Sequence, residues 1–571
     1  MRELKNTYQL WYEIVFVTIL LTLVASYFLI KYTWEINNDW GPFEGHLKVI
    51  PLIIRDTKDF KLTSFYQYKD YLLENNYAIK WLLQILIPFS ICLLFSLFIA
   101  FKLFWIKGGI DKAIHISGGR LLKDKFAIKH AKRILEKEYK NSLTIGLNLH
   151  PQITISEKQE LGNILVTGAQ GSGKSTVIKP LVNAISNTED LMLIYDAKQE
   201  YTQLFLKQNN LLLSPTDTRS LCWDIAADVS SPEVAYEIAS CFISQSGKEP
   251  IWANGARLLL TGCMVSLNHI KPEWSWDDLK DILDKPTDEL KSLFDRYYPK
   301  ASKLIAENSK TTDSFIMELT TQLSWLDSVA KVWTKDSKYK FSITHWIEGH
   351  YNFKSLIIAN DPKYSSISAP LCSAVLSIVV REVLSLPDDN KRKFWLVLDE
   401  LADLPKTQAL DKWLSLGRSK GARTIAGTQN ISQIQAIYGD KITETLTSLF
   451  SNIITLKIGS SAETAKKVAD NLGKRLVKRA NISFDKEGKR STSYQQSEEY
   501  IVRPEQLMQL PSPNKNGITG YLSVSGWNAV YELIWPYHEL EVIAEARVPV
   551  ELGDHSFETL ARGSRGRKRK C

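Results

Sequence analysis

The sequence predicts an α/β nucleotide-binding fold that is interrupted by an inserted all-helical segment and preceded by two membrane-spanning helices. A complete phosphate-loop motif, from Gly168 to Ser175, follows a short β-branched run. Other short apolar runs recur downstream, as they do in parallel sheets whose strands are buried on both faces. Two long apolar runs stand near the N-terminus. At 571 residues the chain is too long for one compact core, so we expect two or three domains.

Residues 1–107 are predicted to form a membrane anchor. The runs Ile14–Ile30 and Trp81–Phe101 have the length of membrane spans, and Trp and Tyr residues flank the first one. A cleaved signal peptide is the alternative for the first run, but no small-residue cleavage site follows it. Basic residues dominate the stretch after the second run, so both termini are expected in the cytoplasm, with residues 31–80 as a loop across the membrane.

The loop after the first predicted strand has the residues needed to hold phosphates. Its glycines allow positive φ angles, so that successive backbone N–H groups can turn toward an anion. Lys174 would reach the β and γ phosphates of ATP, and the Ser175 hydroxyl would ligate Mg²⁺. The predicted nucleotide-binding residues are Gly168, Ala169, Gln170, Gly171, Ser172, Gly173, Lys174, Ser175 and Thr176.

A second motif is the apolar strand Phe394–Leu398, which ends in Asp399 and Glu400. Beside the phosphate loop, Asp399 would complete the Mg²⁺ shell and Glu400 would polarise the attacking water. A capped helix start at Asp399 is the alternative. Arg418, in a basic turn, and Gln429, after the next strand, are further catalytic candidates, with a surface loop and a helix cap as their alternatives.

The domain organisation follows from where strand and helix patterns fall. Apolar runs predict four more strands, at Leu191–Tyr195, Ser355–Ala359, Thr424–Gly427 and Asn452–Lys457. Between them lie helix-start signals at Ser231-Pro232-Glu233 and Ser275, and the apolar segment Arg257–Val265. We therefore expect a nucleotide-binding domain at 108–224 and 336–547, an inserted all-helical domain at 225–335, and a basic tail at 548–571.

Composition sets only loose limits on function. The net charge of +8 suits contact with nucleic acid or anionic lipid, and it equally suits an ordinary soluble surface. The 6 cysteines show no paired metal-ligand spacing, which favours structural thiols in a reducing compartment. An ATP-binding-cassette permease is disfavoured because Leu414 to Arg418 lacks the paired glycines of the transporter signature.

The chain resembles the type IV secretion coupling proteins, the membrane ATPases of bacterial conjugation, and most of all their TraD-like branch. The matching stretches run in order along nearly the whole chain. Besides the phosphate loop, they are Ser117 to Arg120, Tyr195-Asp196 with Glu200, Ser214 to Arg219 with Trp223, Glu249 to Trp252, Phe341 to Trp346, Trp395 to Leu401, Gly417-Arg418, Gln429, Gln433, Tyr438-Gly439 and Leu507 to Pro511.

The resemblance implies a RecA-like domain with a helical insertion, assembled as a homohexamer on two helices of the bacterial inner membrane, with residues 31–80 in the periplasm. It further implies an ATPase that recognises a relaxase bound to single-stranded DNA and delivers it to a type IV secretion channel. It places Arg418 toward the neighbouring subunit's nucleotide. Two departures are Ser214, where relatives often carry Asn, and a short basic end, Arg562 to Lys570, in place of a long tail.

Two rival functions remain open at the level of sequence. A septal-type DNA translocase that segregates chromosomes would share the motor, although its long linker and winged-helix end are not visible here. The second rival is a membrane receptor that uses ATP only as a switch to dock protein substrates. The polar cluster of Asp196, Lys198 and Glu200 has no role that the sequence assigns, and the identity of the relaxase leaves no readable signature.

Overall fold

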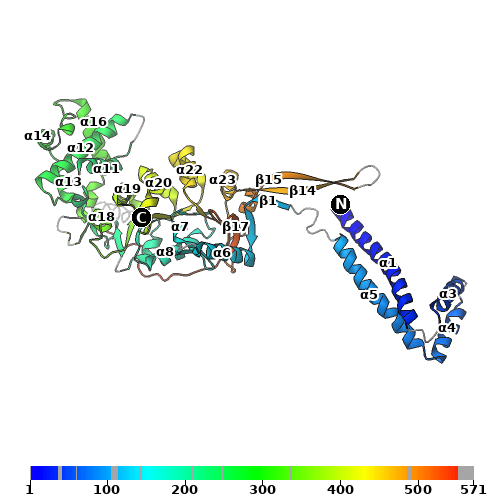
Figure 1. Cartoon of the computed structure of the whole chain (residues 1–571). Helices are drawn as coiled ribbons and strands as arrows, with labels where there is room; N and C mark the ends of the chain where they lie inside the picture. The colour runs from blue at the N-terminus through cyan, green and yellow to red at the C-terminus, as the bar shows by residue number, and fades with distance from the viewer. Residues whose placement is uncertain are drawn as a thin grey trace, which may run out of the picture. The chain divides into compact units, whose positions relative to one another are not determined.

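The computed structural model describes residues 2–36, 41–58, 61–104, 114–140, 144–207, 210–245, 249–334, 337, 339–404, 406–484 and 490–550 (Figure 1). The chain divides into two compact units. The first comprises Met1–Ile114 and Lys478–Ser497, and the second comprises His115–Val477 and Glu498–Cys571. The basic end of the chain, from residue 551 onward, lies outside the described residues, and with it the stretch Arg562 to Lys570.

The first unit is built on two long helices that pack against each other, α1 (Arg2–Ile36) and α5 (Ala78–Phe104). Val15–Ile36 and Ala78–Ala100 within them are long and apolar enough to cross a membrane, and only 17% of each stretch is buried. The two predicted N-terminal apolar helices are therefore confirmed. Between them the chain forms α2 (Phe43–Leu47), α3 (Val49–Lys58) and α4 (Thr63–Glu74).

The second unit is organised around a 10-stranded sheet in the order β2-β17-β16-β13-β5-β12-β11-β6-β10-β7. Neighbouring strands are parallel from β7 to β13, as the continuous apolar runs predict. The antiparallel pair β16–β17 then extends the sheet toward β2. The strands are β2 (Arg120–Lys123), β5 (Ile164–Thr167), β6 (Leu191–Asp196), β7 (Asn210–Leu213), β10 (Ser355–Ala359), β11 (Phe394–Leu398), β12 (Ala422–Thr428), β13 (Asn452–Thr455), β16 (Ile518–Val524) and β17 (Ala529–Trp535).

Helices cover both faces of this sheet, because alternate residues of each strand point to opposite sides. Leu193 and Leu396 pack in one core with α19 (Ser365–Ser385) and α20 (Gln408–Leu416). Ile194 and Val397 pack in a second core with α6 (Asp124–Tyr139), α8 (Lys174–Ser186) and α9 (Glu200–Phe205). Figure 1 shows α19 and α20 on one side of the sheet and α6 and α8 on the other. The predicted α/β fold class is confirmed.

One helix of the sheet unit has the length and apolar composition of a membrane span. The segment Pro362–Ser385 contains α19 and is 72% buried. Because the sheet and the neighbouring helices cover it, its apolar character is that of a core helix.

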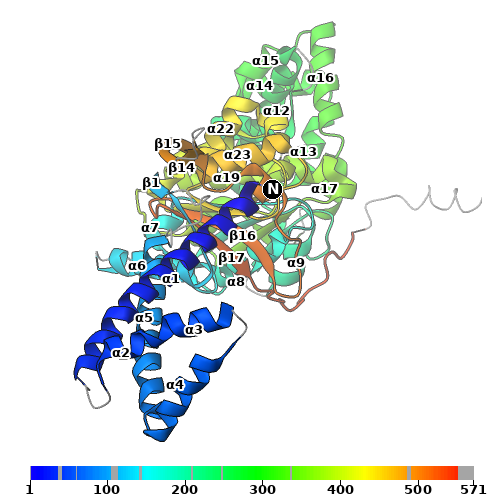
Figure 2. The ribbon, with the colours of Figure 1, turned by 90° about the vertical axis from the view of Figure 1, so that its right-hand side faces the viewer.

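Between two short paired strands, β8 (Cys222–Trp223) and β9 (Lys340–Phe341), the described chain contains helices and no strand. Ser231 caps α11 by accepting from the Val234 N–H, and Ser275 opens α13 with a capping box, at the two predicted starts. Figures 1 and 2 both show α12, α14 and α16 gathered at one end of this unit. The helices are α10 (Ile225–Asp228), α11 (Pro232–Phe242), α12 (Pro250–Ile270), α13 (Trp276–Leu283), α14 (Thr287–Tyr297), α15 (Pro299–Ser302), α16 (Lys310–Gln322) and α17 (Leu326–Val332).

Two further sheets are separate from the 10-stranded one. They are the β3–β4 hairpin and a three-stranded sheet in the order β1-β14-β15. These strands and the remaining α-helices are β1 (Ile114–Gly118), β3 (Ile145–His150), β4 (Ile153–Ser156), α7 (Glu157–Glu160), α18 (Ile343–Ile347), α21 (Ile431–Tyr438), α22 (Asp440–Ser448), α23 (Ala462–Leu472), β14 (Lys474–Phe484), β15 (Arg490–Tyr500) and α24 (Pro504–Met508). The domain boundaries drawn from the sequence stay predictions.

Candidate nucleotide-binding site

The phosphate-loop motif connects β5 to the N-terminus of α8. Gly171 (φ +73°) and Gly173 (φ +92°) adopt the left-handed backbone that the motif requires. Gly168 is needed for space instead, because a Cβ there would collide with the Ser172 hydroxyl. The first N–H groups of α8 have no partner within the helix, so the loop and the helix end together favour an anion.

The carboxyl ends of four adjacent strands, β5, β12, β11 and β6, meet at this edge of the sheet. Ligands of open α/β sheets bind outside such an edge, where the strand order changes direction. A cavity of about 400 Å³ opens here. Its lining residues are Ala169, Gln170, Gly171, Gly173, Lys174, Ser175, Thr176, Lys198, Glu200, Gln429, Pro513 and Tyr537.

Lys174, which lines this cavity, forms a buried ion pair with Glu400. The Lys174 Nζ donates to Glu400 Oε2, and the two side chains are only 7% and 4% exposed. The Gln429 backbone N–H donates to Glu400 Oε1 at 3.2 Å. The structure therefore brings the two sequence motifs and Gln429 together, with the Lys174 cation paired to the Glu400 carboxylate.

Asp399 lies beside this pair with three polar neighbours. Its Oδ1 is 3.5 Å from Ser175 Oγ, the other predicted Mg²⁺ ligand. The Tyr201 hydroxyl donates to the same oxygen at 3.0 Å, and Lys198 Nζ is 3.7 Å from Oδ2. Burial raises the pKa of Tyr201 well above its usual value, so this hydroxyl keeps its proton and holds the carboxylate in place.

The sequence assigned no role to Asp196, Lys198 and Glu200. Lys198 and Glu200 line the cavity, and Asp196 supports the turn before them. Asp196 ends β6 and accepts from the Thr202 N–H at 2.7 Å and from the Thr202 hydroxyl at 2.9 Å, which fastens the start of α9. The intervening turn presents Lys198 to the cavity. Glu200 pairs with Lys179 of α8 at 2.6 Å. Asp196 is thus a buried support, and burial raises the pKa of its carboxyl.

Arg418 lies at the other edge of the sheet. It is exposed, in a 3₁₀ turn (Gly417–Lys420) just before β12, whereas Gln429 follows the last residue of that strand. A strand rises about 3.3 Å per residue, so the 7 residues of β12 separate the two by about 20 Å. Arg418 lines a second cavity of about 490 Å³ with Glu138, Ser156, Lys158, Gln159, Gly162, Ser451, Asn452 and Ser525.

Several residues at the site could not be found from sequence. Tyr201 carries no motif around it, and Pro513 and Tyr537 reach the cavity from the far end of the chain. Aromatic and proline side chains at the rim are suited to pack against a nucleobase. Lys198 and Glu200 could be indicated as site residues from sequence, because both follow the end of a strand in a parallel sheet.

The residues present fit a nucleotide with Mg²⁺. Within the part of the chain that the structure describes, the hydroxyls of Ser172 and Thr428 are buried beside the loop without a hydrogen-bond partner. Such buried donors require an acceptor. Lys174 supplies a charge for phosphate, while Ser175 and Asp399 supply the hard oxygen ligands that Mg²⁺ prefers.

The protein therefore belongs to the class of RecA-type α/β proteins, which carry a phosphate loop at the carboxyl edge of the sheet. The family model of the type IV secretion-system coupling protein DNA-binding domain matches residues 148–526. The chain belongs to this family of coupling proteins.

Individual relatives agree with this assignment. The coupling protein TraD of Escherichia coli (strain K12) is 24% identical over 478 residues, which cover 81% of this chain. The chain spans 64% of the length of that relative. Among solved structures, the conjugative coupling protein TrwBdeltaN70 in its unbound form matches with a TM-score of 0.64 at 24% identity, covering 76% of this chain and 96% of that one. TrwB in complex with ADP and Mg²⁺ matches with a TM-score of 0.63 at 24% identity, over 78% of this chain and 99% of that one.

Proposed function

We propose that this chain is a conjugative coupling ATPase, which uses Mg²⁺-ATP to drive the transfer of single-stranded DNA with its bound relaxase into a type IV secretion channel. The observation that carries the proposal is the convergence of two motifs at one cavity: Lys174 and Ser175 line it, Glu400 pairs with Lys174, and Asp399 lies beside Ser175. The binding of ADP and Mg²⁺ by TrwB supports the same ligands here. The family match favours this function over that of a chromosome-segregating translocase.

Each residue has a role that follows from its position. Lys174 and the loop N–H groups hold the β and γ phosphates, and Ser175 and Asp399 hold Mg²⁺. The bound ion would neutralise charge on the transferring phosphoryl group. Glu400 accepts a hydrogen bond from the attacking water and orients it, and Gln429, which lines the same cavity, contacts the γ phosphate.

The Lys174 ammonium group has two possible partners in this site. It donates to Glu400 Oε2, and the γ phosphate of a bound nucleotide would compete for the same ammonium group. Nucleotide binding would then leave Glu400 Oε2 free to accept from the attacking water.

The assembly is proposed on the position of Arg418. It lies too far from the phosphate loop of its own chain to contact the nucleotide there, so a nucleotide that Arg418 contacts is one bound by a neighbouring copy. Closed rings of identical subunits provide such contacts at every seam. We infer a homohexamer anchored by α1 and α5 in the bacterial inner membrane lipid, with both termini in the cytoplasm and partners in the relaxase–DNA complex and the channel components.

The test measures ATP turnover by the full-length protein in detergent with and without single-stranded DNA. We expect DNA to stimulate turnover, Lys174→Ala to lose nucleotide binding, and Glu400→Gln to bind ATP without hydrolysing it. Turnover that DNA leaves unchanged would favour the receptor that uses ATP as a switch. Retained turnover in Lys174→Ala would overturn the proposed ATPase site.

A further inference from the structure

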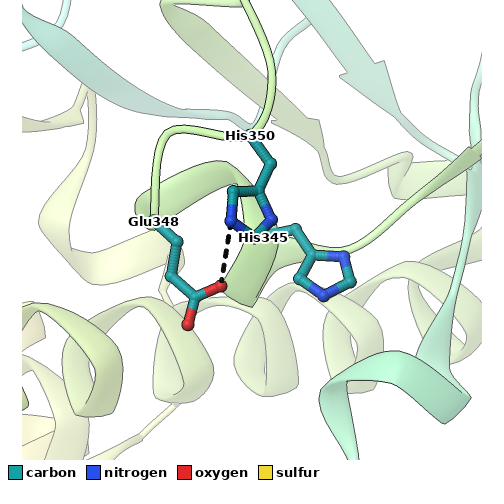
Figure 3. Close-up of side chains that lie close together, drawn as sticks. All are labelled: His345, Glu348 and His350. Atoms are coloured by element: carbon teal, nitrogen blue, oxygen red, sulfur yellow. Dashed lines mark ion pairs between the residues drawn. The ribbon is translucent and has the colours of Figure 1, made fainter.

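Three side chains with metal-ligating atoms gather at the end of α18, away from the nucleotide cavity. They are His345, Glu348 and His350 (Figure 3), and their ligating atoms all lie within 4.8 Å of one another. His350 Nε2 is 3.8 Å from Glu348 Oε2, and the two imidazole rings are 5.1 Å apart between centroids. His350 and Glu348 are 60% and 49% exposed, so an ion in solution can reach them.

The backbone brings these side chains together. The Gly349 N–H donates to the Trp346 carbonyl at 3.1 Å, and the His350 N–H donates to the His345 carbonyl at 2.9 Å. These two bonds form a Schellman motif, which closes a helix and reverses the chain. Gly349 provides the positive φ of +85° that the motif needs. His350 is therefore folded back over the last turn, next to the side chain of His345.

The start of α18 is held as firmly as its end. The buried Asp228 carboxylate accepts from the Ser342 hydroxyl at 2.7 Å and from the N–H groups of Ile343 and Thr344 at 3.0 and 2.9 Å. The Trp346 indole donates to the Phe353 carbonyl at 2.9 Å. The three candidate ligands thus stand on a rigid backbone, which lowers the conformational entropy lost when they take up an ion.

We propose that His345, Glu348 and His350 form a binding site for a divalent transition-metal ion of the Zn²⁺ class. Two imidazole nitrogens and one carboxylate oxygen suit Zn²⁺, whereas Mg²⁺ and Ca²⁺ prefer oxygen ligands alone. Three protein ligands leave a coordination position for water. The site braces the turn by which the chain, after β9, passes from the inserted helices back toward β10.

The test uses full-length protein in detergent, without a histidine tag, stripped of metal and kept in excess Mg²⁺. Zn²⁺ is titrated by calorimetry, and Co²⁺ is titrated in parallel because its visible absorption reports the ligand geometry. We expect one more bound Zn²⁺ in the parental protein than in His350→Ala. The exposed His538, which lies outside the cluster, provides the matched control, and His538→Ala should bind as the parent does.

Gly349→Ala separates a built site from a chance encounter of three surface side chains. It retains all three ligands, and the added Cβ meets no atom within 4 Å, so only the backbone conformation is strained. We expect its Zn²⁺ affinity to fall by about tenfold or more, as for other changes that misorient ligands. Equal Zn²⁺ stoichiometry and affinity in the parent and His350→Ala, or an unchanged affinity in Gly349→Ala, would overturn the proposal. ATP turnover verifies that each variant is folded.

Discussion

Arg418 allows a quantitative test of whether the active site is shared between copies of the chain. The 7-residue strand β12 separates it by about 20 Å from the edge that carries Gln429 and the phosphate loop, which is beyond the reach of one arginine side chain. Arg418→Ala should therefore leave ATP binding intact. It should lower turnover on the order of 10³-fold, as the loss of a trans arginine does in other nucleoside triphosphatases.

Mixing two inactive variants then separates a shared site from a local defect. In Glu400→Gln the chain keeps Arg418, and in Arg418→Ala it keeps Glu400. A seam is intact when an Arg418→Ala subunit binds the nucleotide and a Glu400→Gln subunit supplies the arginine. In randomly mixed rings at equal amounts this holds for about one seam in four, so turnover should recover to about a quarter of the parental value.

The assay is steady-state ATP turnover of the full-length protein across a range of mixing ratios. The double variant Glu400→Gln/Arg418→Ala mixed with Glu400→Gln is the control, because no seam then contains both intact residues. Parental turnover in Arg418→Ala alone, or no recovery in the mixture while both variants still assemble, would refute the shared site.

Three further predictions concern single side chains. Tyr201→Phe removes the hydroxyl that orients Asp399, and the Mg²⁺ concentration for half-maximal turnover should rise about tenfold in a Mg²⁺ titration. Arg423→Met leaves the Glu160 carboxylate, 1% exposed, without its partner at 3.1 Å, and the free energy of unfolding in urea should fall by about 3 to 5 kcal/mol. Burial lowers the pKa of His150, both of whose ring nitrogens are hydrogen-bonded. The neutral His150 side chain therefore contributes its full stabilisation of the fold above the unfolded pKa of about 6.5. As the pH falls below this value, the free energy of unfolding decreases by at most about 1.4 kcal/mol per pH unit. His150→Asn should flatten this pH dependence, as measured by urea unfolding at several pH values.

Each of these predictions has a control and a contradicting result. Lys123→Met breaks an ion pair whose lysine is 56% exposed and should cost less than about 1 kcal/mol, so an equal loss in Arg423→Met would contradict the importance of burial. His538→Asn, at an exposed histidine, should leave the pH dependence unchanged. An unaltered Mg²⁺ requirement in Tyr201→Phe would show that Asp399 is held by other contacts.

The sequence predicted the parts of the protein whose signals are local. The phosphate loop, the strand ending in Asp399 and Glu400, and the capped helix starts at Ser231 and Ser275 each lie within a few adjacent residues, where backbone geometry dictates the residue types. The apolar helices near the N-terminus belong to the same group, because a membrane span needs an uninterrupted apolar run.

Other strands of the sheet gave no such signal. The strands β16 and β17 mix buried with more exposed positions, and the edge strand β2 has no buried position. Their places in the sheet depend on long-range pairing, because β16 pairs with β13 and β2 pairs with β17. Cross-strand neighbours decide such elements more than intrinsic propensity does. A continuous apolar run, by contrast, is typical of a central parallel strand, so the central strands can be predicted from sequence.

The class of chemistry follows from local sequence, because a phosphate loop and a strand ending in two carboxylates need only a few adjacent residues each. Which side chains meet depends on how the whole chain folds. The fold pairs Lys174 with Glu400, 226 residues away, brings Tyr201 and Lys198 to Asp399, and places Arg418 at the opposite edge of the sheet. Strand order and direction, set by long-range packing of the apolar faces, determine which strand ends share an edge.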